Sequence, residues 1–192
     1  RSNDTYARFL LGEVFYLLGE TEAAHSIFLQ LVRLDQEDDE FISENIWRIK
    51  AGLGLVKVAL NDVELGLVML KEAAALKPNQ IGLMHKLAEA YLKADLEDLA
   101  INIAKDAFEA AGTNVKNLTW YADFMERLDK KEDVVNALEQ AFQLSHKNSK
   151  LIVRLAKEYV SIGKTENAKE ILNEMIESNT GDSADFRNAA IT

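Results

Sequence analysis

Acidic side chains are the residues of this sequence whose clustering could do chemistry, and they are densest in two segments. The segment LAEAYLKADLEDLAINIAKDA (87–107) combines carboxylates with two lysines and a tyrosine. The segment DQEDDE (35–40) has five acids in six residues. Paired carboxylates can act as general acid and base, and clustered ones can bind Ca²⁺. Either use requires a geometry that brings the carboxylates together.

Neither segment has the spacing of a known catalytic or metal site. An EF-hand loop spreads its ligands over twelve residues around a central glycine, and 35–40 has no glycine. The histidines, His25, His85 and His146, share no metal-binding motif. The sequence contains no phosphate-binding glycine loop, no nucleophile elbow and no zinc-protease motif, and it has no cysteine. We therefore expect no enzyme activity and no cofactor or metal.

Composition favours helices throughout. The 192 residues are 48% hydrophobic and include one proline, Pro78, beside many Ala, Leu, Glu and Lys. No apolar run is long enough to cross a bilayer, so we expect no membrane insertion. A net charge of −10 argues against general nucleic-acid binding. The lack of cysteine is compatible with either redox compartment, and we favour the cytoplasm.

A repeat of 34 residues organises most of the chain. Small residues recur at this spacing in two columns: Gly54, Ala88, Ala122 and Ala156, then Gly66, Ala100, Val134 and Ala168. An earlier copy has Gly12 and Ala24 at the same relative places, 42 residues before their counterparts. Apolar residues recur every three or four positions within each copy, which predicts two amphipathic helices. Small residues let the two helices approach to roughly 8–10 Å.

Short turns separate the two predicted helices of each copy. They read LLGETEA, ALNDVEL, LKADLED, RLDKKED and SIGKTEN, and each has Gly, Asn or Asp at the reversal. These residues tolerate the left-handed backbone conformation that ends many helices. The segment 87–107 is therefore one repeat with a solvated acidic face, and 35–40 is a charged connector before a lengthened helix.

These features resemble the tetratricopeptide repeat (TPR). The 34-residue helix–turn–helix unit and its columns of small and large residues match that family over about 5–180, and Pro78 closes one copy. Lys57 departs from the pattern by replacing a mid-helix aromatic residue. The resemblance implies an all-α fold, a right-handed α-solenoid of tandem antiparallel helix pairs in a single domain over 1–192. Its copies are approximately 5–38, 47–80, 81–114, 115–148 and 149–182.

The last residues, 183–192, have two interpretations. Phe186, Ala189 and Ala190 fall on the columns of a sixth copy, which the end of the sequence would truncate. The alternative is a polar capping helix, with which solenoids normally end. We also interpret the chain, which begins at Arg1, as a piece of a longer protein.

The resemblance further implies a non-catalytic scaffold whose concave groove binds a peptide or helix of a partner protein. Carried over copy by copy, the groove residues are Phe9, Glu13, Tyr16, Arg48, Ala51, Leu55, His85, Glu89, Leu92, Thr119, Trp120, Asp123, Glu126, Val153 and Lys157. Phe9, Tyr16 and Trp120 are the expected hot spots, although Phe9 and Trp120 could instead pack between repeats. The acids among these residues disfavour a clamp for a carboxylate tail, and we expect a partner with apolar anchors and some Lys or Arg.

Three further hypotheses follow from the sequence. The chain could be a substrate-recognition or regulatory segment of an enzyme whose catalytic domain lies outside it. A basic patch at Lys147–Lys169 could bind RNA, but the net charge disfavours this. Finally, residues 1–44 carry ten acids and three bases, whereas 145–169 carry six bases and two acids. Such opposite ends could associate head to tail.

Overall fold

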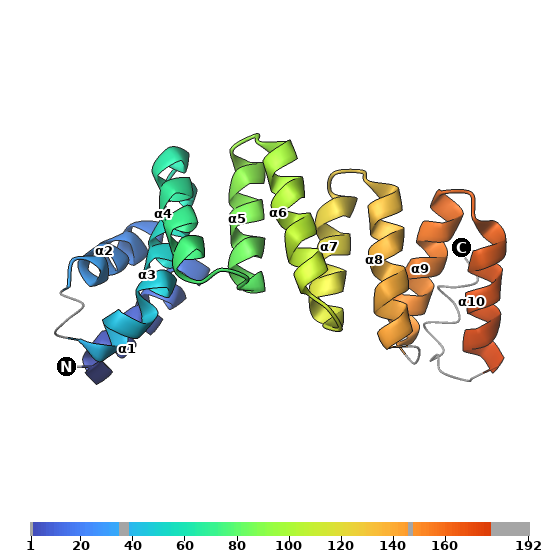
Figure 1. The fold of residues 1–192 in the computed structure, drawn as a ribbon, viewed down its shortest axis with the longest axis horizontal. Helices are drawn as coiled ribbons and strands as arrows, with labels where there is room; N and C mark the ends of the chain where they lie inside the picture. The colour runs from blue at the N-terminus through green and yellow to red at the C-terminus, as the bar shows by residue number, and fades with distance from the viewer. Residues whose placement is uncertain (1, 35–38, 146–147, 178–192) are drawn as a thin grey trace. The chain divides into compact units, whose positions relative to one another are not determined.

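The computed structural model describes residues 2–34, 39–145 and 148–177, and within these ranges all regular secondary structure is α-helical (Figure 1). The chain divides into two compact units, residues 1–106 and 107–192. The boundary falls within helix α6 (Glu97–Ala110). The expected cap or sixth copy at 183–192 lies outside the described residues.

The helices follow the predicted copies in pairs. The first helices are α1 (Ser2–Leu17), α3 (Glu40–Ala59), α5 (Ile81–Lys93), α7 (Val115–Glu126) and α9 (Ser149–Ser161). The second helices are α2 (Thr21–Val32), α4 (Val63–Leu76), α6, α8 (Lys131–Leu144) and α10 (Thr165–Glu177). The helices α5, α7 and α9 begin 34 residues apart, as do α4, α6, α8 and α10. The predicted period is therefore the period of the helices.

The turns within the pairs share one backbone geometry. Residues in the left-handed region recur at the repeat spacing, and they are Gly19, Asn61, Asp95, Asp129 and Gly163, with φ between 54° and 79°. In each turn the following N–H donates to a carbonyl five residues earlier, as Leu96 N does to Tyr91 O at 3.0 Å. This is the Schellman helix end, and it explains why each turn has Gly, Asn or Asp at this position.

Helix α3 is longer than the other first helices, as the sequence predicted. It has 20 residues, whereas α5 and α9 have 13 each. Asp39 caps it by accepting hydrogen bonds from the N–H groups of Phe41 and Ile42. The Thr5 hydroxyl donates to the same carboxylate at 2.6 Å, which ties the start of α3 to α1. The hydroxyl and the two amides lower the pKa of Asp39.

The closest helix crossing that the glycines allow is between α3 and α4. A Cβ atom at Gly54 would lie 2.8 Å from the Gly66 carbonyl oxygen, and one at Gly66 would lie 2.7 Å from the Gly54 carbonyl oxygen. Two backbones can approach this closely only where neither residue has a side chain. The two columns of small residues thus meet at the crossing point, as predicted from the repeat.

Each unit has its own apolar core. In unit 1 the core joins Phe9 of α1, Phe28 and Leu31 of α2, and Ile49 and Leu53 of α3. The Phe9 and Phe28 rings meet edge to face, with centroids 6.0 Å apart. In unit 2 the most deeply buried large side chains are Tyr121, Phe124, Met125, Leu138 and Ile152. The packing of consecutive pairs therefore fixes which faces of the first helices remain accessible.

Candidate protein-interaction groove

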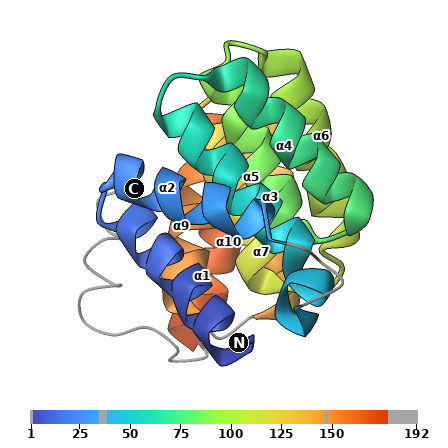
Figure 2. The ribbon, with the colours of Figure 1, turned by 90° about the vertical axis from the view of Figure 1, so that its left-hand side faces the viewer.

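The first helices of three consecutive copies surround a hollow in unit 1. Helix α3 packs against both α1 and α5, and Figure 2 views unit 1 from the side of α1, α2 and α3. The hollow has a volume of about 410 Å³. Its lining residues are Glu13, Tyr16, Leu17, Phe28, Trp47, Arg48, Ala51, Gly52, Leu55, Gln80, Gly82, Leu83 and Lys86. This volume is within the range of sites that hold small ligands or a few side chains.

The floor of the hollow is apolar and aromatic because of a glycine in α3. A Cβ atom at Gly52 would lie 2.7 Å from the Phe28 ring, so only glycine lets the ring of α2 reach this point. Leu55 and Leu83 complete the apolar surface from α3 and α5. The floor could therefore accept an apolar side chain of a partner.

Charged groups lie at the edge of this floor. The Arg48 guanidinium lies 4.6 Å from the centroid of the Phe9 ring and 3.9 Å from the Glu13 carboxylate. Lys86 of α5 is the other cation of the lining. With two cations and one anion, this hollow has no surplus of acid for a basic partner. The expected preference for Lys or Arg receives no support at this point of the groove.

A second hollow continues the first one along α3 and α5. It has a volume of about 230 Å³ and is lined by Tyr16, Leu55, Val58, Ala59, Glu89, Ala90 and Lys93. Tyr16 and Leu55 line both hollows. Burial raises the pKa of the Tyr16 hydroxyl. Lys93 Nζ donates to the Val58 carbonyl oxygen at 2.8 Å, which fixes the lysine at the edge.

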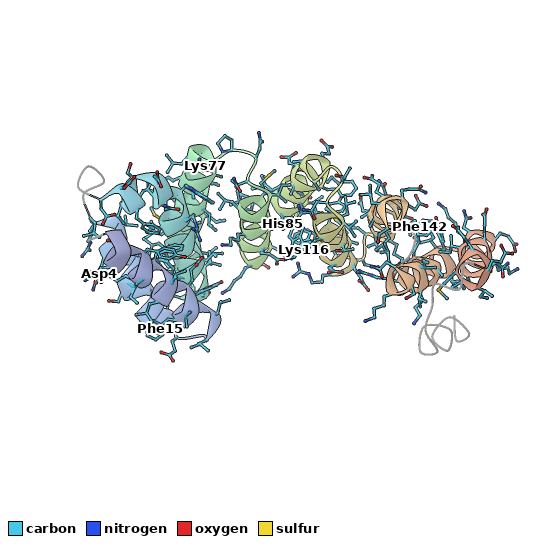
Figure 3. The ribbon with its side chains drawn as sticks, turned by 90° about the horizontal axis from the view of Figure 1, so that it is seen from below. Asp4, Phe15, Lys77, His85, Lys116 and Phe142 are labelled. Carbon is cyan, nitrogen blue, oxygen red and sulfur yellow. The ribbon has the colours of Figure 1, made fainter. Side chains whose placement is uncertain are left out.

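The predicted groove residues of unit 1 thus come together, apart from Phe9. Glu13, Tyr16, Arg48, Ala51, Leu55 and Glu89 all line the two hollows. His85 and Leu92 lie half-buried on α5 (Figure 3). Burial lowers the pKa of His85 to about 4, and the nearby Glu89 carboxylate opposes this shift only in part. His85 is consequently neutral at pH 7.

The expectation that Phe9 is an exposed hot spot is wrong. Its side chain is 0% exposed and packs against the rings of Phe28 and Phe41. Together with Thr5 and Gly12 it forms the buried stripe of α1. The alternative that the sequence left open, packing between helices, is the correct one.

In unit 2 the predicted residues have mixed environments. Trp120 is half-buried and stacks on Phe124 with centroids 5.2 Å apart, and Val153 is buried. The Thr119 hydroxyl donates to the Lys116 carbonyl oxygen at 3.0 Å. Lys157 is exposed.

Arg154 neutralises the two predicted acids of unit 2. Its guanidinium forms ion pairs with Asp123 at 2.5 Å and with Glu126 at 2.7 Å. Sequence reasoning missed this residue, as it missed Trp47 and Lys86 in unit 1. A signal existed for Arg154 only in its position three residues before Lys157, close to one helical turn.

A third hollow lies between α8, α9 and α10. It has a volume of about 420 Å³ and an acidic lining that includes Glu139, Glu170 and Glu174. The Tyr159 hydroxyl donates to Glu139 at 2.8 Å. Over the described ranges, no three His, Asp or Glu side chains are placed to hold a metal ion. In the same part of the chain, no helix has the length and apolar content needed to span a membrane.

Paired antiparallel helices at a 34-residue period, with small residues at their crossings, define the TPR-type α-solenoid class. The chain belongs to the family ChAPs (Chs5p-Arf1p-binding proteins), whose sequence model matches residues 44–188. No curated protein gives a significant match. The fold and family make this chain a protein-interaction scaffold.

Solved structures confirm the fold class. MamA from Desulfovibrio magneticus, from residue 41 to its end, shares 16% identity, with 93% of this chain and 97% of that one covered and a TM-score of 0.59. A thermophilic TPR protein from Thermus thermophilus shares 20% identity, with 97% of each chain covered and a TM-score of 0.55. At these identities the likeness extends to the fold alone.

Proposed function

We propose that this chain is a non-catalytic adaptor that binds a segment of a partner protein in the groove of unit 1. The groove is defined by the two hollows that share Tyr16 and Leu55. The observation that supports this proposal is convergence: six residues predicted from the repeat, on three different first helices, line these hollows. Packing alone did not require them to surround one accessible surface.

The lining indicates what such a segment contains. The floor formed by Phe28, Leu55 and Leu83 fits a large apolar side chain, and such anchors supply most of the energy at protein interfaces. Arg48 and Lys86 at the edge fit a carboxylate or a backbone carbonyl of the same segment. An extended peptide or an amphipathic helix can present both kinds of group.

The family name records which proteins its members bind. These are Chs5p and Arf1p, and we infer that this chain binds a protein of the same kind. The groove of unit 1 is the surface that we assign to that contact.

The experiment measures the affinity of the full chain for purified Chs5p and Arf1p by isothermal titration calorimetry. Leu55→Glu places a charge in both hollows, and we expect a loss of affinity of tenfold or more, because a buried unpaired charge is costly. Leu65→Glu is the matched control, since Leu65 is an exposed leucine of α4 that lines neither hollow. Equal affinities of Leu55→Glu and wild type would exclude the groove as the site. Absence of binding by the wild-type chain would exclude both named partners.

A further inference from the structure

Helix α1 is apolar on two opposite faces, although only one of them is packed. Thr5, Phe9 and Gly12 form the packed face. Large apolar side chains on the rest of the helix are between 39% and 82% exposed, and they are Tyr6, Leu10, Leu11, Val14 and Leu17, with Leu18 just beyond the helix end. A helix that is apolar all round is normally covered on all sides. A contiguous exposed patch of this kind usually marks an interaction site.

The repeat shows what covers this face in the other copies. The counterparts of Leu11 are Leu53, Leu87, Tyr121 and Leu155, and all four are buried. The counterparts of Val14 in the next three copies are Val56, Ala90 and Phe124, and these are buried too. Leu53 and Val56 of α3 belong to one core cluster with Phe28 and Leu31 of α2. The face that α1 exposes is therefore the face on which a second helix of another pair packs.

Helix α10 presents a surface of the required kind. It is the last second helix of the described copies, and its Leu172 and Ile176 correspond to Phe28 and Val32 of α2. Ile176 is 59% exposed. The acids Glu170 and Glu174 line the hollow with α8 and α9, so they lie on a different side of α10 from Ile176. Lys169 lies within two turns of Ile176 and is exposed.

We propose that a second copy of this chain docks its α10 on the exposed face of α1, head to tail. The contact repeats the packing of α2 on α3, with Leu172 and Ile176 against Leu11 and Val14. Charge favours this pairing, because residues 1–44 carry ten acids and three bases while 145–169 carry six bases and two acids. The two surfaces differ, so each added copy exposes a new α1 face and the association stays open-ended.

Sedimentation velocity of the full chain tests this proposal over a range of protein and salt concentrations. We expect wild type to form oligomers that grow with protein concentration and shrink as salt is raised. The double variant Leu11→Glu with Val14→Glu blocks the α1 face, and Ile176→Glu blocks the α10 face. All three side chains are exposed, so the variants should keep the wild-type circular dichroism spectrum. Each variant alone should sediment as a monomer, and an equimolar mixture should give a dimer.

The mixture distinguishes this geometry from the alternatives. Val68→Glu, at an exposed valine of α4, is the control and should associate like wild type. A monomeric wild type at all concentrations overturns the proposal. Association of Ile176→Glu alone indicates a symmetric contact between α1 helices and also overturns it. Loss of association in Val68→Glu would show that any added charge disrupts assembly, which removes the support for an α1 contact.

Discussion

Arg154 of α9 lies 2.7 Å from Glu126 of α7, and its second amino group pairs with Asp123 on the same helix. One guanidinium therefore neutralises two acids that the sequence suggested were available to a basic partner. The pairs also tie together the first helices of two consecutive copies within unit 2.

Replacing Arg154 by methionine should lower the free energy of unfolding by about 1 kcal/mol at low salt, because two partly exposed ion pairs are lost. The decrease should shrink in high salt, which screens exposed charges. Urea denaturation at two salt concentrations measures both effects. Lys157→Met on the same helix removes a cation for which no ion pair is found among the described residues. A similar salt-dependent loss in that variant would refute a specific role for the Arg154 pairs.

The turns predict opposite effects for two Gly→Ala substitutions. A Cβ atom at Gly163 or at Gly82 would have no neighbour within 4 Å, but Gly163 has a φ of +79°. Alanine at Gly163 should destabilise the fold by about 1–2 kcal/mol through backbone strain. Alanine at Gly82, in the first turn of α5, should be neutral or stabilise by up to about 1 kcal/mol. Thermal unfolding of the two variants checks this, and equal destabilisation would contradict the Schellman assignment.

The α3–α4 crossing predicts a larger effect at Gly66. A Cβ atom there would lie 2.5 Å from a Val58 methyl and 2.7 Å from the Gly54 carbonyl oxygen. The backbone oxygen cannot move without separating the helices, so Gly66→Ala should cost about 1–3 kcal/mol. Urea denaturation gives the value, with Gly82→Ala as the comparison. A stability equal to wild type would mean that the two helices do not cross this closely.

His85 makes stability depend on pH. Its pKa is lowered from 6.5 to about 4 in the folded chain. Between these values the unfolded chain binds a proton that the folded chain does not, so stability falls as the pH is lowered through this window. His85→Gln cannot be protonated, and its melting temperature should fall less than that of wild type between pH 7 and pH 5. Identical decreases in both proteins would show that His85 is not responsible.

The helix pairs could be predicted from sequence because columns such as Gly54 to Ala156 recur at one spacing. The turns were predictable for the same reason, since Asn61, Asp95 and Asp129 occupy one position of the repeat. The environment of Phe9 was not predictable in this way. Helix α1 has apolar residues all round, so no amphipathic pattern indicates which face is buried.

The charge of the groove was also outside the reach of sequence reasoning. Glu13 and Asp123 fall on the predicted face, but their cations belong to later helices, Arg48 on α3 and Arg154 on α9. Which side chains meet across helices depends on their orientation in three dimensions and not on the repeat spacing. The hollow next to Gly52 likewise depends on where the Phe28 ring lies.

Site-specific photo-crosslinking tests the proposed groove most directly. A photoreactive phenylalanine analogue at Leu55 would lie in both hollows, and the same analogue at Leu65 would lie on the exposed side of α4. With a purified partner that binds the full chain, we predict a crosslink from position 55 that competes with unlabelled wild type, and none from position 65. Crosslinking from position 65 and not from position 55 would contradict the assignment of the groove as the binding site.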